Sequence, residues 1–252
     1  MAREISLQQT LTNAIEHQLE NSHTAMPGIV VAVDLINQQL TVQPSLNIKM
    51  YDGSASIERP PITNVPLQFP SSKSSAFTFP VAPGDVVLLV FSERGLDAWK
   101  AGNGYPSTPV DFRMMDYNDA IAIPGIYSRS GAINNPATRV WKHDVQDTVV
   151  VHNIGQSTET EIRLPLAGGI VINTSQSVDV NCKDANINAT NSASILTPDL
   201  DIDATNITIV GNVVHTGNFT NTGILSSDGV ILNAHVHKNV NPGTGISGPP
   251  VV

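Results

Sequence analysis

Two histidines near the C-terminus, His235 and His237, are the residues whose type and spacing point most directly to chemistry. They lie in the stretch Ala234-His235-Val236-His237. Because successive side chains of a strand alternate between its faces, both imidazoles face the same side. Imidazole is the commonest metal ligand, although most histidines bind nothing. If this side faces the axis of a three-chain assembly, six nitrogens meet there, and such an octahedral set suits iron or nickel better than zinc.

The segment that must position these histidines, residues 168–233, is typical of a slender β-structure. Eleven of the twelve aromatic residues lie at or before Trp141, so this segment fills its interior with small aliphatic side chains. Short strands separated by tight turns predict a β-helix or solenoid without a strict repeat. Each strand buries too little by itself, and we therefore predict that three copies wind about one axis. Apolar pairs recur at strand spacing at Ile170/Ile172, Val178/Val180, Ile187/Ala189, Leu200/Ile202, Ile207/Ile209 and Val230/Leu232.

Composition and charge exclude several classes of function. The net charge of −9 argues against binding along a phosphate backbone. The single cysteine, Cys182, cannot form an intrachain disulfide, so the fold needs no oxidising compartment. We expect no secretory signal, because the N-terminus is polar from the start. No apolar run approaches the roughly 20 residues that a membrane helix needs.

The N-terminal residues 1–26 predict one short amphipathic helix. From Glu4 to Glu20, apolar residues recur every four positions and form one stripe. Met26-Pro27-Gly28 is expected to end this helix. The stripe packs either on its own domain or on a neighbouring subunit, and the pattern leaves both open. The residues of the stripe are Leu7, Leu11, Ile15 and Leu19.

Residues 27–130 predict an all-β domain, a small barrel of the OB-fold type. The turn Pro83-Gly84-Asp85 opens the apolar run Val86 to Phe91, whose length is that of a buried strand. Leu96 to Lys100 predicts one helical turn. Residues 131–167 form a connecting segment with two further strands. The remaining predicted strands are Ile29–Ile36, Leu40–Val42, Val65–Phe69, Ala76–Phe79, the stretch from Asp119 to Gly125, Thr148–Asn153 and Glu161–Leu164.

The predicted barrel is interpreted as structural. OB-folds often bind nucleic acid or sugar, and a basic stripe with interleaved aromatic residues is typical of that use. The basic residues here are scattered instead, at Lys49, Arg59, Lys73, Arg94, Lys100 and Arg113. We therefore expect no nucleic-acid partner.

Taken together, these features resemble the central, membrane-puncturing spike protein of contractile-tailed bacteriophages. The resemblance rests on the short N-terminal helix, the barrel motifs from Pro83 to Leu88 and from Asp119 to Gly125, the strand-rich stem and the terminal His-Val-His. It covers most of the chain. The fold that the resemblance implies is all-β, with an OB-fold barrel followed by a trimeric, intertwined β-helical stem and a metal-bound tip.

The resemblance implies a homotrimer at the tip of the phage tail, joined through its barrels to the hub or baseplate. It implies one iron ion per trimer on the threefold axis, with His235 and His237 of each chain as ligands, in an apex of residues 234–252. Sheath contraction would drive this needle through the host outer membrane into the periplasm. Some spikes carry a lysozyme domain, for which this chain has no segment, so we expect no enzymatic activity.

The main alternative is a trimeric β-helical tail fibre or tailspike that binds or cleaves host surface polysaccharide. Such a protein needs an aromatic-lined groove or two carboxylates at glycosidase spacing. The predicted stem has one aromatic residue, Phe219. The sequence also lacks a G-x-S-x-G, an H-E-x-x-H and a phosphate-binding loop.

Overall fold

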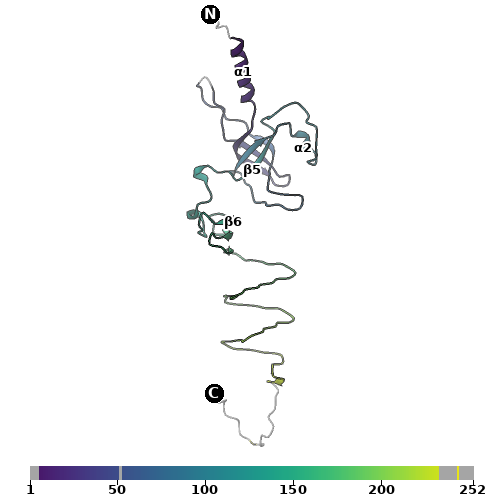
Figure 1. Cartoon of the computed structure of the whole chain (residues 1–252), viewed down its shortest axis with the longest axis vertical. Helices are drawn as coiled ribbons and strands as arrows, with labels where there is room; N and C mark the ends of the chain where they lie inside the picture. Colours follow the sequence, from purple (N-terminus) through teal and green to yellow (C-terminus); the bar gives the residue numbers. More distant parts are fainter. Residues whose placement is uncertain (1–5, 51–52, 233–242, 244–252) are drawn as a thin grey trace. The chain divides into compact units, whose positions relative to one another are not determined.

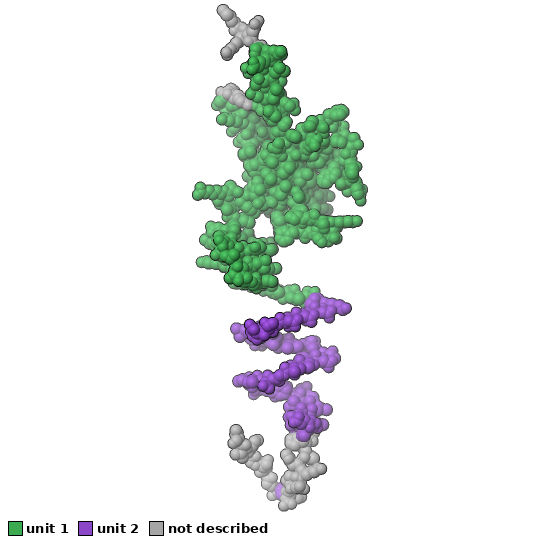
Figure 2. Space-filling model, in the orientation of Figure 1, with its two compact units in different colours: residues 1–181 green, residues 182–252 purple. Residues whose placement is uncertain are grey.

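The protein is described here from a computed structural model that covers residues 6–50, 53–232 and 243. The chain divides into two units, residues 1–181 and 182–252 (Figure 2). The described part is mostly β-structure with few helices, which confirms the all-β prediction. Within it, no helix combines the length and apolarity needed to cross a lipid bilayer.

The first element is helix α1, Leu7–Glu20, which confirms the N-terminal helix (Figure 1). It begins at Leu7 because the Ser6 side chain caps it, accepting a hydrogen bond from the Gln9 backbone N–H at 3.2 Å. None of its residues is buried, and the four apolar side chains of the stripe are 56–76% exposed. Packing on its own domain is therefore wrong for the described chain, while contact with a neighbouring subunit stays a prediction.

The predicted end of this helix is also wrong. The helix ends at Glu20, and Met26, Pro27 and Gly28 lie inside strand β1, Ala25–Asp34. The strand runs through Pro27 because a proline occupies extended backbone readily and the residue before it is pushed toward that region.

Five strands form one curled antiparallel sheet in the order β3-β2-β1-β4-β5 (Figure 1). Register shifts occur between Val30 and Ala32 of β1 and between Leu40 and Val42 of β2, and irregularities of this kind bend a sheet. The curl brings the two edges together, where Leu67 bridges Ala122 in parallel and the Gln68 N–H donates to the Ala122 carbonyl at 2.9 Å. The other strands are β2 Gln39–Pro44, β3 Ile62–Pro66, β4 Val86–Phe91 and β5 Ala120–Pro124.

The buried strand predicted at Val86–Phe91 is confirmed as β4. Its odd-numbered side chains Val87, Leu89 and Phe91 point into the core, and their neighbours are half-buried. The predicted turn before it is also confirmed, with Gly84 at φ +99°. The whole core is Met26, Val30, Leu40, Val42, Ile62, Val65, Val81, Val87, Leu89, Phe91, Ala120 and Ala122.

Of two further elements predicted in this region, the structure confirms a helical turn and contradicts a strand. The helical turn at Leu96–Lys100 is confirmed as α2, Asp97–Ala101. The strand at Ala76–Phe79 is wrong, because only Ala76 is paired, through an isolated bridge to Ser71. Phe77 and Phe79 instead form edge-to-face contacts with each other, and Phe79 also with Phe69. The apolar spacing of these residues reflects this aromatic cluster.

Gly28 fills a site where the sheet has no space for a side chain. A Cβ atom there would lie 2.5 Å from Val42 Cγ1 and 3.1 Å from Leu89 Cδ1. We predict that Gly28→Ala lowers the free energy of unfolding by about 1–3 kcal/mol, because overpacking forces these core side chains to move. Urea denaturation checks this, with Gly131→Ala as the control, since a Cβ there meets only the Ser128 hydroxyl oxygen at 3.3 Å. Equal midpoints for the two variants would contradict the prediction.

A second sheet, in the order β6-β7-β8, follows the barrel in the first unit. The strands predicted at Thr148 and Glu161 are confirmed as β6, Thr148–His152, and β7, Thr160–Leu164. The third strand is β8, Val171–Asn173. Two short 3-10 helices, η1 Arg129–Gly131 and η2 Pro136–Thr138, precede this sheet.

The second unit contains little regular structure among its described residues. A hairpin of β9, Ser226–Ser227, and β10, Val230–Ile231, is its strand pair. Upstream of this hairpin the chain runs back and forth as a thin, extended trace (Figure 2). Ile172 of the predicted stem pairs with β7 and Val230 with β9, whereas the predicted strands from Val178 to Ile224 have no strand partner among the described residues. The β-helix therefore stays a prediction.

Candidate functional site

The predicted metal ligands His235 and His237 lie outside the described residues. The structure therefore neither brings them together nor separates them, and the iron site stays a prediction. In the described ranges, no three His, Cys, Asp or Glu side chains gather in a way that could hold a metal ion.

The stem of the second unit is the described region most clearly incomplete in one chain. Every residue from Cys182 to Leu232 is exposed. Apolar side chains ordinarily pack in an interior, and a large unpaired set of them marks an interaction surface. The exposed apolar side chains here include Ile187, Ile195, Leu196, Leu200, Ile202, Ile207, Ile209, Val210, Val213, Val214, Phe219 and Ile224.

Much of the backbone of this stem also lacks hydrogen-bonding partners within the described chain. Between residues 182 and 222, described backbone groups form no hydrogen bonds with one another. The bonds that do form are local side-chain bonds such as Thr197 Oγ1 to the Asp199 carbonyl at 2.7 Å. An extended chain with free N–H and C=O groups is able to add strands on both sides. The described stem therefore exposes both apolar side chains and backbone hydrogen-bonding groups.

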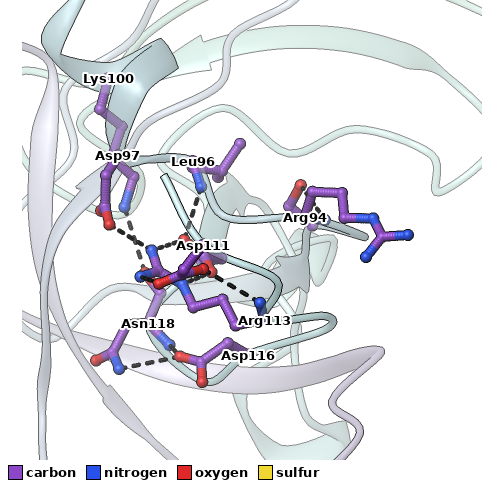
Figure 3. Close-up of polar contacts among 10 residues, drawn as sticks. Arg94, Leu96, Asp97, Lys100, Asp111, Arg113, Asp116 and Asn118 are labelled. Atoms are coloured by element: carbon purple, nitrogen blue, oxygen red, sulfur yellow. Dashed lines mark hydrogen bonds and ion pairs between the residues drawn. The ribbon is translucent and has the colours of Figure 1, made fainter. Parts of the chain in front are cut away.

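In the first unit, the connection between β4 and β5 is fixed to the sheet by a charged cluster around Arg113 (Figure 3). Arg113 donates from Nε to Asp119 Oδ2 at 2.6 Å and from Nη2 to Asp119 Oδ1 at 2.9 Å. The same guanidinium bonds Asp97 of α2 and, at 3.0 Å, Asp111. Asp119 also accepts from the Leu96 backbone N–H at 2.8 Å. One buried carboxylate thus ties two points of this connection to the start of β5.

The electrostatics of this cluster agree with a structural role. The Asp119 side chain is fully buried, and burial alone would raise its pKa. The hydrogen bonds from Arg113 and Leu96 outweigh this and hold the pKa of Asp119 below its ordinary value. Its partners raise the pKa of Arg113 further above its already high value. Both groups are therefore permanently charged near neutral pH and serve as fixed ions.

A second buried carboxylate organises the segment before the small sheet. Glu159, which is fully buried, accepts hydrogen bonds from the backbone N–H groups of Trp141, at 3.1 Å, and Gly155. Burial would raise its pKa, but these bonds and the nearby Arg139 lower it. The Trp141 indole N–H donates in turn to the Glu159 carbonyl at 3.0 Å. The sequence does not reveal either carboxylate site, because the partners of Asp119 and Glu159 lie in loops that have no periodic pattern.

A hollow on the barrel is relevant to the alternative function. It has a volume of about 430 Å³, and Phe69 and Trp99 line it together with the amide side chains of Gln38 and Gln68. Aromatic rings beside amide groups are able to bind sugars or peptides. The sequence does not reveal this hollow, because Phe69 and Trp99 are 30 residues apart in the chain.

Comparisons with known proteins place the first unit's barrel among phage proteins. Residues 26–125 match the family model described as "Phage protein Gp138 N-terminal domain". The match begins within β1 and ends directly after β5, so it spans the curled sheet. It supports a phage protein with a structural, virion-associated role. A search of curated proteins found no match.

Proposed function

We propose that this chain forms a homotrimeric needle at the tip of a contractile phage tail, which pierces the host outer membrane when the sheath contracts. The observation that carries the proposal is the stem of the second unit, downstream of a phage protein domain. Its exposed apolar side chains and unpaired backbone leave it without a core of its own. Three copies wound about one axis would bury the apolar side chains and pair the backbone groups. They would also leave no open sheet edge to fray under load.

The curled sheet is part of this proposal, as an OB-fold that attaches the needle to the tail hub or baseplate. The strand order β3-β2-β1-β4-β5, closed by the parallel contact between Leu67 and Ala122, supports the OB-fold. The scattered basic residues and the net charge of −9 speak against nucleic acid as its partner. The role is mechanical, so we propose no enzymatic activity.

The proposed apex carries one iron ion on the threefold axis, held by His235 and His237 of each chain. The donor set fits the group, because two imidazoles per chain give six nitrogens per trimer, and imidazole suits iron. A metal bound only by the assembled trimer also stabilises that assembly, since binding energy in such a site contributes to folding. The apex would then close the stem into a firm point.

The test is light scattering combined with elemental analysis of the purified full-length chain. We expect a mass of three chains and about one iron per three chains, as the six-imidazole site requires. His235→Ala should lose the iron, and His215→Ala, a stem histidine that instead contacts Phe219, should keep it. A trimer without metal would contradict the proposed apex site, and a monomer would contradict the proposed needle.

The alternative, a tail fibre that binds or cleaves host polysaccharide, is favoured by one observation. The hollow beside Phe69 and Trp99 offers aromatic surface and amide groups to a sugar. Incubation with host polysaccharide decides between the two functions. Released oligosaccharide, or binding that Trp99→Ala abolishes, would support the fibre, and the absence of both would leave the needle.

A further inference from the structure

The sheet β6-β7-β8 has two faces of opposite character. In the register, Val151, Glu161 and Asn173 form one cross-strand row, and Arg163 lies on the same face two residues after Glu161. Glu161 Oε1 accepts from Asn173 Nδ2 at 2.8 Å. This face therefore carries both charged residues of the sheet, Glu161 and Arg163, beside the valines that pair with them.

The charged face is covered by the chain's own residues 139–147. Arg163 Nη1 donates to the Lys142 carbonyl at 2.7 Å, and Asp147 Oδ1 accepts from the Leu166 N–H at 2.8 Å. Glu161 is 1% exposed and His143 is 7% exposed. The sheet thus directs its charged residues inward, the reverse of the usual arrangement.

The opposite face is open and apolar. Its central row is Val150, Ile162 and Ile172, with exposures of 49, 48 and 55%. Leu164 lies beside this row on the same face and is 46% exposed. The other described strand residues of this face are Thr148, His152 and Thr160, so no Asp, Glu, Lys or Arg of these three strands points to it.

We propose that this open face, defined by Val150, Ile162, Leu164 and Ile172, is the surface on which three copies of the chain first meet. The inference rests on the proposed trimer and names its contact surface in the first unit. Copies of the chain fit better than an unrelated partner because each carries a net charge of −9, and close approach requires a face free of acidic groups. The apolar residues of this face are followed in sequence by the exposed pair Val178 and Val180, directly before the stem.

This contact also sets the register of the three chains. A shift of one residue in a strand moves its apolar side chains to the other face, so a row such as Val150, Ile162 and Ile172 specifies one alignment. The sheet is held together by its own hydrogen bonds within each chain, whereas the described stem is not. Three prefolded sheets that meet here align the stems before they wind.

The first test is assembly of full-length Ile162→Asp after refolding from denaturant, followed by light scattering across a dilution series. The substitution places a carboxylate in the centre of the open face, and we expect the concentration for half-maximal trimer to rise at least tenfold. The control is Val145→Asp. Val145 is 56% exposed and lies in the segment that covers the charged face. It should assemble like the unmodified chain.

A second measurement avoids any loss of folding. In a Cys182→Ala background, Ile162→Cys should give covalently paired chains with a short bifunctional maleimide, while Val145→Cys should not. If the unmodified protein is a trimer, but Ile162→Asp assembles normally and Ile162→Cys does not cross-link, the contact surface is wrong and the needle proposal stands. A monomeric unmodified protein would overturn both.

Discussion

Replacing Arg113 with alanine is expected to destabilise the barrel by about 3–5 kcal/mol, the usual cost of removing one partner from a buried ion pair. The variant leaves the Asp119 carboxylate without its two guanidinium bonds in a fully buried position. It also releases Asp97 and Asp111 from the same guanidinium. Urea denaturation of the barrel, followed by far-UV circular dichroism, measures the change in the free energy of unfolding.

The matched control is Arg94→Ala, in the same connection between β4 and β5. Arg94 approaches only the neighbouring Glu93, at 3.7 Å, and its side chain is 46% exposed. Exposed pairs of this kind contribute about 0–1 kcal/mol. Similar losses for Arg94→Ala and Arg113→Ala would show that the cluster does not hold this connection.

The same cluster makes the free energy of unfolding depend on pH, and the direction follows from the lowered pKa of Asp119. Its pKa is lower in the folded protein than in the unfolded chain, so the folded state favours the ionised form. This contribution is complete above the unfolded pKa of about 4 and is lost as the pH falls through the lower folded value. In urea titrations between pH 7 and pH 3, the stability difference between the unmodified protein and Asp119→Asn should therefore be constant down to about pH 4–5 and shrink below it.

The sequence predicted several strands of the curled sheet because local patterns determine these elements. The run Val86–Phe91 is too apolar and too short for anything but a buried strand, and Pro83-Gly84-Asp85 marks its start. The errors occurred where a local signal was ambiguous. Pro27 predicts a helix end although it lies in strand β1, and the spacing of Phe77 and Phe79 predicts a strand although the two rings belong to an aromatic cluster.

The small sheet β6-β7-β8 shows a second limit of prediction from the sequence, which concerns the face that points inward. Along β7, Glu161, Ile162, Arg163 and Leu164 alternate between charged and apolar residues. That alternation predicts a strand, but it does not say which face is inward in a single chain. The usual rule would bury Ile162 and expose Glu161, whereas the structure buries Glu161. The alternation alone does not decide which of the two faces points inward.

Replacing Glu159 with alanine is the second large effect that we predict. The carboxylate accepts from the backbone N–H groups of Trp141 and Gly155, and its charge lies near Arg139, which is 7% exposed. The variant removes two hydrogen bonds from part-buried backbone N–H groups to a charged carboxylate, worth about 1.5–3 kcal/mol each, and it removes a compensating charge from Arg139. We therefore expect the small sheet and its covering segment to lose about 3 kcal/mol or more of stability.

Trp141 provides a local probe for this loss, because its indole N–H donates to the Glu159 carbonyl. In a Trp99→Phe background, Trp141 is the one tryptophan left, and its fluorescence reports unfolding around the small sheet. Glu159→Ala should shift that transition to lower urea concentration, whereas Glu58→Ala, at an exposed glutamate of the barrel, should leave it unchanged. An unchanged transition in Glu159→Ala would mean that the backbone hydrogen bonds between β6, β7 and β8 hold the small sheet together without the Glu159 contacts. The covering segment would then be dispensable, and the charged interior would contribute little to the stability of this part of the chain.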